Sequence, residues 1–202
     1  MSLIALEGID KSGKRTQTQF LLARLKKVGV DSESIAFPDY GTPLGKSIQN
    51  FLHGHVQFCP EVRQLLYVAN RWERKNDIDR WLKAGKVVIA NRYVPSGLVY
   101  GLANDLDLNW MKKLEEGLPP TNLVIVIDVT VDTAFNRFKE QKRDIYESNK
   151  PFLEKVRTTY LTLANELKWT VINGESSIEK IHEQIWRKVR DLLRSHSGTL
   201  MS

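Results

Sequence analysis

LIALEGIDKSGKRTQ, residues 3–17, decides the fold of this 202-residue chain. An apolar run is followed by a loop bounded by glycines and then by residues that favour a helix. Gly8, Gly13 and Lys14 match the spacing Gly, four residues, Gly, Lys, which is typical of a phosphate-binding loop. In such a loop backbone N–H groups converge on phosphate oxygens, and the lysine reaches the terminal phosphates. The stretch therefore predicts a strand, a nucleotide-phosphate site and a helix, in that order.

One position of this loop departs from the pattern. A serine or threonine normally follows the lysine, and its hydroxyl holds Mg²⁺. Here the residue is Arg15. Thr16 cannot simply replace the missing hydroxyl, because the next residue on a helix points about 100° away. The sequence thus leaves the protein ligands of a metal ion unknown.

Composition and charge exclude several classes of protein. With 42% hydrophobic and 27% charged residues, the chain is expected to form one globular domain over residues 1–202. We expect a cytoplasmic protein without a signal peptide or a membrane span, since no apolar run approaches about 20 residues. The single cysteine, Cys59, excludes an internal disulfide, and the four histidines show no metal-ligand spacing. The net charge of +6 is spread along the chain, so no nucleic-acid polymer is expected as a partner.

Short apolar runs alternate with helical patterns along the whole chain. The runs expected as strands are residues 3–7, 34–37, 87–90, 123–129 and 170–172. The segments expected as helices are residues 16–28, 43–52, 61–82, 96–103, 109–114, 131–142, 151–167 and 178–193. This alternation predicts an α/β fold of three layers, with a mostly parallel five-stranded sheet and helices on both faces. Residues 143–150 lack periodicity and are expected to be a mobile loop, and residues 195–202 a frayed end.

Ligands of such sheets bind beyond the carboxyl ends of the strands, and chemically active residues gather there in this sequence. Arg92 follows the apolar strand 87–90, where its guanidinium can clamp a phosphate through two hydrogen bonds. Asp10 within the loop would repel phosphate, so it indicates a second ligand that carries a hydroxyl group. Lys11 beside it could stabilise charge during transfer. Alternatively, Asp10 and Lys11 form a local surface pair and Arg92 is an ordinary surface arginine.

Two further segments suggest a base pocket and a lid. Tyr67, Asn70 and Arg71 share one helix face, which would allow a ring to stack on a nucleobase beside an arginine. Aromatic packing with a salt bridge explains the same spacing. The basic cluster around Arg143 could close over phosphates, although a solvated loop would have the same composition.

Taken together, these stretches resemble the thymidylate kinase family, the P-loop enzymes that move the γ-phosphoryl group of ATP onto dTMP. The resemblance covers nearly the whole chain. It is most specific in Glu7–Lys14, Ala69–Glu73, Arg92-Tyr93 with Ser96-Gly97, Gly117–Pro119 and Asp144–Glu147. It implies a P-loop NTPase fold, ATP and dTMP as substrates, Mg²⁺ carried with ATP, and a homodimer.

The resemblance also implies roles for individual residues. The residues that would bind ATP are Gly8, Ser12, Gly13, Lys14, Arg15, Thr16 and Arg137. Those that would bind dTMP are Asp10, Phe37, Tyr67, Asn70, Arg71, Arg92, Ser96, Tyr100 and Tyr146. Within that set, Asp10 would contact the 3′-hydroxyl, Arg92 the phosphate, and Arg71 the O4 atom of thymine. Lys14, Lys11 and Arg92 are the expected catalytic residues, and Arg143 belongs to the expected lid.

Three positions differ from the family pattern. Arg15 and Asn91 stand at the two usual metal-ligand positions, and Tyr40 stands where many relatives have a second phosphate-binding arginine. The first two changes shift the charge of the metal site by about +2, which disfavours a divalent cation. The sequence therefore leaves open a non-catalytic or weakly active nucleotide-binding paralogue. A P-loop deoxynucleoside kinase is a third possibility, against which the Asp10-Lys11 pair and residues 69–73 argue.

Overall fold

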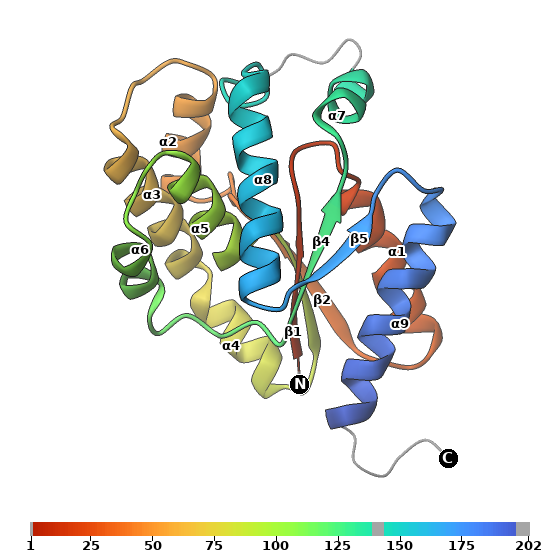
Figure 1. The fold of residues 1–202 in the computed structure, drawn as a ribbon. Coiled ribbons are helices and arrows are strands. Elements are labelled where there is room, and N and C mark those ends of the chain that lie inside the picture. Colours follow the sequence, from red (N-terminus) through yellow and green to blue (C-terminus); the bar gives the residue numbers. More distant parts are fainter. Residues whose placement is uncertain (1, 139–143, 197–202) are drawn as a thin grey trace.

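A computed structural model describes residues 2–138 and 144–196, and within them a single parallel sheet forms the centre of the fold (Figure 1). Its strands are β1 (Ser2–Glu7), β2 (Ser32–Ala36), β3 (Val87–Asn91), β4 (Leu123–Asp128) and β5 (Thr170–Asn173). They lie in the order β2-β3-β1-β4-β5, and every neighbouring pair is parallel. The predicted five-stranded sheet is confirmed.

The burial of the strands follows from their places in the sheet. All six residues of β1 are buried, because β1 lies between β3 and β4 and is covered on both faces. Its sequence is accordingly almost continuously apolar, as expected of a central parallel strand. The edge strand β2 has the more polar sequence SESIA and is only partly buried. The carboxyl end of β1 leads directly into the phosphate-loop sequence.

Helices connect the strands. They are α1 (Lys14–Lys27), α2 (Pro43–Leu52), α3 (Pro60–Glu73), α4 (Lys75–Lys83), α5 (Val94–Ala103), α6 (Leu108–Glu115), α7 (Val131–Phe138), α8 (Lys150–Glu166) and α9 (Ile178–His196). Helices α1 and α9 cover one face of the sheet (Figure 1), where Leu21, Leu25 and Ile185 pack on Ile4 and Leu6. The other face is covered by α4, α5 and α8. The predicted three layers are therefore confirmed.

The single helix predicted over residues 61–82 is wrong. The chain bends at Arg74, which ends α3 and precedes α4 with φ −106° and ψ 1°. The two halves have different packing partners, since α3 lies against α2 and α5 while α4 lies under β3. Arg74 also forms ion pairs with Asp39 and Asp77, at 3.5 and 3.2 Å. Apolar spacing continues across the bend, so periodicity alone could not reveal it.

Other element boundaries differ from the prediction by a few residues. Strand β2 spans residues 32–36 instead of 34–37, and α5 begins at Val94, because Pro95 is well suited to a first helical turn. Helix α9 continues to His196, so residues 195 and 196 are helical. The predicted segments 139–142 and 197–202 lie outside the described residues. Across the part of the chain that is described, none of the helices is long and apolar enough to cross a membrane.

Candidate active site

The loop between β1 and α1 has the backbone conformation that its glycines permit. Gly8 has φ +130°, and a Cβ atom there would lie 2.4 Å from the carbonyl oxygen of Ile127. Gly13 has φ +102° and immediately precedes α1. Side chains rarely adopt these conformations, so both positions require glycine. The loop therefore turns tightly and presents the N-terminus of α1 to the space beyond the sheet.

Lys14 is folded into this loop. Its Nζ donates hydrogen bonds to the carbonyl oxygens of Gly8 and Ile9, at 3.0 and 2.8 Å, and to Ser12 Oγ at 3.4 Å. Burial, together with the positive charge of Arg92, lowers the pKa of Lys14 to about 7. A phosphate anion in the loop would favour the charged form of the amine. The lysine thus lies within the loop that the sequence predicts to bind phosphate.

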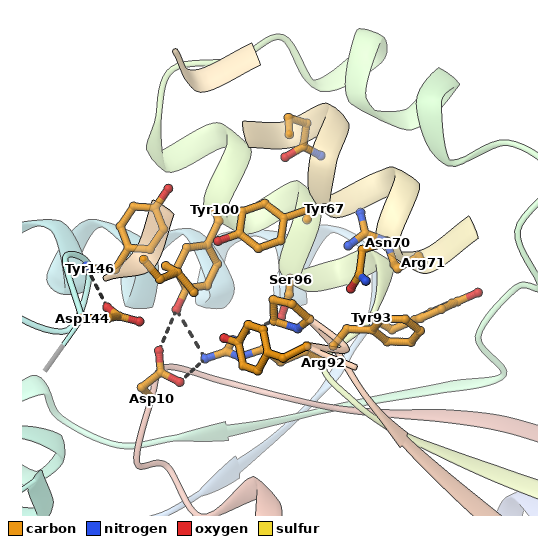
Figure 2. Close-up of a pocket in the computed structure, with 16 residues that line it drawn as sticks. Asp10, Tyr67, Asn70, Arg71, Arg92, Tyr93, Ser96, Tyr100, Asp144 and Tyr146 are labelled. Carbon is orange, nitrogen blue, oxygen red and sulfur yellow. Dashed lines mark hydrogen bonds and ion pairs between the residues drawn. The ribbon is translucent and has the colours of Figure 1, made fainter. Parts of the chain in front are cut away.

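Asp10 and Arg92 form an ion pair across the mouth of the loop (Figure 2). Arg92 Nη2 donates to Asp10 Oδ1 at 2.7 Å and to the hydroxyl of Tyr100 at 3.4 Å. Burial alone would raise the pKa of Asp10, but the charges of Arg92 and Lys14 outweigh it and lower the pKa. Residues 10 and 92 come from the ends of two adjacent strands, as the parallel topology predicted. The alternative of an ordinary surface arginine is wrong, because the Arg92 side chain is only 12% exposed.

A pocket opens beside this pair. Every residue that the family resemblance assigned to dTMP lines it, and these are Asp10, Phe37, Tyr67, Asn70, Arg71, Arg92, Ser96, Tyr100 and Tyr146. Figure 2 shows the rings of Tyr67, Tyr100 and Tyr146 gathered on one side of the pocket. Aromatic walls with a few convergent polar groups are typical of small-molecule sites. The arrangement suits a ligand that has a flat ring and a negatively charged group.

Arg71 at the end of this pocket is held by a residue that the sequence analysis missed. Its Nε donates to Glu115 Oε2 at 3.0 Å, and its Nη2 contacts Glu115 Oε1. Both side chains are buried. Gly97 leaves room for the pair, since a Cβ there would lie 2.6 Å from Arg71 Nη2. A buried arginine needs an acid partner, but nothing in the local sequence shows which acid supplies it.

Asn70 lines the pocket while its amide group is bound to the loop before α2. Its Oδ1 accepts from the backbone N–H of Asp39 at 2.8 Å, and its Nδ2 donates to Thr42 Oγ1 at 2.8 Å. Nδ2 also donates to Glu73 Oε2 at 3.0 Å. These bonds indicate that Asn70 shapes the pocket wall.

The described part of the predicted lid, residues 144–149, is a hydrogen-bonded turn rather than an irregular loop. The carboxylate of Asp144 accepts from the backbone N–H groups of Tyr146 and Glu147, both at 2.8 Å. Tyr146 is buried and stacks on Phe152, with ring centroids 4.9 Å apart. The turn places the Tyr146 ring over the pocket. Arg143 lies outside the described residues, and α8 begins at Lys150 instead of Pro151.

A second pocket lies along the phosphate loop and joins the first. Of the residues assigned to ATP, all but Gly8 line it, namely Ser12, Gly13, Lys14, Arg15, Thr16 and Arg137. Arg137 donates to the carbonyl oxygens of Lys11 and Gly174, at 3.0 and 3.1 Å. Asp10, Tyr40 and Arg92 line both pockets. Two ligands could therefore meet at these residues.

The residues at the usual metal-ligand positions do not fit a metal held by the protein. Arg15 and Asn91 both line the second pocket. A guanidinium has only donors and a positive charge, and an amide brings no negative charge. Within residues 2–138 and 144–196, no group of three or more histidine, cysteine, aspartate or glutamate side chains is placed to hold a metal ion.

Comparisons with known proteins agree with this geometry. A family model described as thymidylate kinase matches residues 6–185. The thymidylate kinase of Schizosaccharomyces pombe is 34% identical, over 91% of this chain and 89% of that protein. The human thymidylate kinase is 31% identical, over 96% of this chain and 92% of that protein. A solved structure of thymidylate kinase from Candida albicans has a TM-score of 0.83 at 27% identity, covering 94% of this chain and 91% of that one.

Proposed function

The chain belongs to the thymidylate kinase family, and on that premise we propose that it transfers the γ-phosphoryl group of ATP to dTMP, giving dTDP and ADP. One feature of the candidate active site supports this proposal most directly. The pocket lined by the expected dTMP residues adjoins the phosphate-loop pocket and shares Asp10 and Arg92 with it. Nothing in the comparisons favours a non-catalytic role, and the matched relatives are thymidylate kinases rather than deoxynucleoside kinases.

We assign the roles as follows. Lys14 and the N–H groups of the loop bind the phosphates of ATP, and Arg92 binds the phosphate of dTMP. Lys11, which lines the phosphate-loop pocket, neutralises charge that develops during transfer. Arg71 and Tyr67 recognise the thymine ring, by hydrogen bonding and stacking respectively. The protein accelerates the reaction chiefly by placing donor and acceptor in line in a site whose charges are already arranged.

Thymidylate kinases generally use ATP with Mg²⁺, which when bound to the phosphates neutralises part of their charge. We propose that the ion arrives with ATP in this protein and is held mainly by the phosphates, because Arg15 and Asn91 offer it no anionic ligand. The guanidinium of Arg15, which is exposed beside the loop, would then supply part of the positive charge.

A coupled assay of ADP release with dTMP, across a Mg²⁺ titration, tests both the activity and this account of the metal. Restoring both ligands in the double variant Arg15→Ser with Asn91→Asp is expected to lower the half-saturating Mg²⁺ concentration by about tenfold and to raise turnover. Each single variant serves as a control for the other position. An unchanged Mg²⁺ dependence would discredit the role given to Arg15. ATP and dTMP binding without ADP release at any Mg²⁺ concentration would contradict the proposed transfer.

We further propose that the chain acts as a homodimer through α3. Val62, Leu65 and Trp72 lie on one face of this helix and are 38, 45 and 40% exposed. Contiguous apolar side chains on a helix surface are typical of an interface. Leu65→Lys is expected to shift the sedimentation coefficient to that of a monomer, whereas the control Leu167→Lys, at an equally exposed leucine after α8, leaves it unchanged. A monomeric wild type would contradict this proposal.

The remaining expectations stay predictions. We propose that residues 1–202 act as one kinase domain whose substrates are small nucleotides, without a nucleic-acid polymer or a membrane as partner. The cytoplasmic location predicted from the sequence has the same status.

A further inference from the structure

We infer that Glu7 is a positioning residue for the acceptor phosphate, because its buried carboxylate fixes the hydrogen directions of the two hydroxyl groups that hold Arg92. This inference rests on the proposed function, in which Arg92 binds the phosphate of dTMP. Glu7 itself lines neither pocket, and the sequence analysis assigned it no role.

Glu7 is the last residue of β1 and has no exposed surface. Its Oε1 accepts from the backbone N–H of Tyr93 at 2.8 Å. Its Oε2 accepts from the hydroxyl of Tyr160, also at 2.8 Å, and from Ser96 Oγ. The two carboxylate oxygens thus have different partners. One accepts a hydrogen bond from the backbone, and the other accepts from two hydroxyl groups.

The same two hydroxyl groups face Arg92. Arg92 Nη1 lies 3.2 Å from Ser96 Oγ and 3.3 Å from the hydroxyl of Tyr160. The two hydroxyl oxygens are 2.8 Å apart. Ser96 is on α5 and Tyr160 is on α8, so three elements of the fold meet behind the guanidinium.

The directions of the two hydroxyl hydrogens follow from the groups on either side of them, which are Arg92 and Glu7. Burial raises the pKa of Glu7, although hydrogen bonds from Ser96 and Tyr160 and the charge of Arg92 oppose the rise. In its ionised form the carboxylate can only accept, whereas a guanidinium can only donate and a hydroxyl can do both. The hydroxyl hydrogens of Ser96 and Tyr160 must therefore turn away from Arg92, toward Glu7 or toward each other. Their lone pairs are then free to accept from Arg92 Nη1. When it is ionised, Glu7 makes the hydroxyl pair an acceptor surface for Arg92.

Holding Arg92 matters because its backbone is in an unusual conformation. Its φ is +67°, which a non-glycine residue rarely adopts. The contacts behind the guanidinium keep Nη1 in place while Nη2 pairs with Asp10. The side chain is therefore held in one orientation at the boundary of the two pockets, and fixing a charged group in this way is how an enzyme site gains from preorganisation.

Glu7→Gln is the most informative variant, because the backbone N–H of Tyr93 fixes the orientation of the glutamine amide group. The N–H of Tyr93 can only donate, so the amide oxygen of Gln has to occupy the Oε1 position. The amide nitrogen then replaces Oε2 and donates to Ser96 and Tyr160 instead of accepting from them. The hydroxyl oxygens receive donors from both sides, and at least one hydroxyl hydrogen is turned toward Arg92. The side chain at position 7 keeps its shape, but the group facing the two hydroxyls changes from an acceptor to a donor.

The experiment compares the affinities for dTMP and thymidine by titration calorimetry. Thymidine lacks the phosphate that Arg92 is proposed to bind. Glu7→Gln is expected to weaken dTMP binding by about tenfold or more while thymidine binding changes by less than about twofold. The Michaelis constant for ATP should stay near that of the wild type. Glu33→Gln is the matched control, since it removes the same charge from an exposed ion pair with Lys86.

Two further variants keep the test decisive if Glu7→Gln does not fold. Tyr160→Phe and Ser96→Ala each remove one acceptor for Arg92 and leave the carboxylate in place. Each is expected to reduce the ratio of dTMP to thymidine affinity by a smaller factor. A ratio equal to that of the wild type in the folded variants would overturn the inference. A wild type that fails to transfer phosphate to dTMP would instead overturn the proposed function, so the two failures are distinguishable.

Discussion

Replacing Lys14 with alanine is expected to reduce phosphoryl transfer from ATP to dTMP by about a thousandfold or more, because the change removes the buried cation of the phosphate loop that is proposed to bind the ATP phosphates. The Nζ atom donates hydrogen bonds to the carbonyl oxygens of Gly8 and Ile9. Lys26→Ala is the control, since Lys26 is exposed at the other end of α1. The measurement is ADP release with saturating dTMP, and near-normal turnover of the Lys14 variant would contradict the assignment.

The same residue is expected to make ATP binding depend on pH. Burial and the charge of Arg92 lower the pKa of Lys14 to about 7, so the amine of the free protein loses its proton as pH rises through neutrality. ATP phosphates bind the charged form better and raise its pKa. The affinity for ATP should therefore fall as pH rises above about 7, and calorimetry in two buffers of different ionisation enthalpy should show proton uptake on binding.

Changing Arg92 to glutamine is expected to lower kcat/KM for dTMP by about 10²- to 10³-fold, with little change in ATP affinity. Arg92 is the cation that lines both pockets and pairs with Asp10 at 2.7 Å. Arg92→Lys keeps the charge but loses the two-pronged geometry, so we expect it to recover only part of the activity. Arg80→Gln, at an exposed arginine on α4, is the control. Wild-type kinetics in Arg92→Gln would mean that the acceptor phosphate is bound elsewhere.

The phosphate loop and the sheet could be predicted because their determinants are local. Gly8, Gly13 and Lys14 lie within seven consecutive positions, and mostly apolar runs of three to seven residues set the strands. Parallel pairing then placed Arg92 beside Asp10, since the carboxyl ends of adjacent strands meet at one edge. The base pocket required the family resemblance in addition, because the spacing of Tyr67 and Arg71 alone favoured core packing with a salt bridge.

The features that the sequence could not show are contacts between distant residues. Glu115 is 44 positions from the arginine that it holds, and Tyr160 is 153 positions from Glu7. No local pattern marks such partners, because many acids and tyrosines in the chain are chemically equivalent until the fold brings particular ones together. The bend at Arg74 has the same origin, since it depends on which surfaces α3 and α4 pack against.

The sequence by itself thus determined the succession of strands and helices along the chain and the phosphate loop. It also determined which charged residues follow the strands. These follow from short-range backbone and side-chain preferences. Only the tertiary structure decided which way those groups point and what holds them there. A buried charge is stabilised by the particular donors and acceptors around it. For Arg92 these include Ser96 on α5, Tyr160 on α8 and Asp10 in the loop after β1.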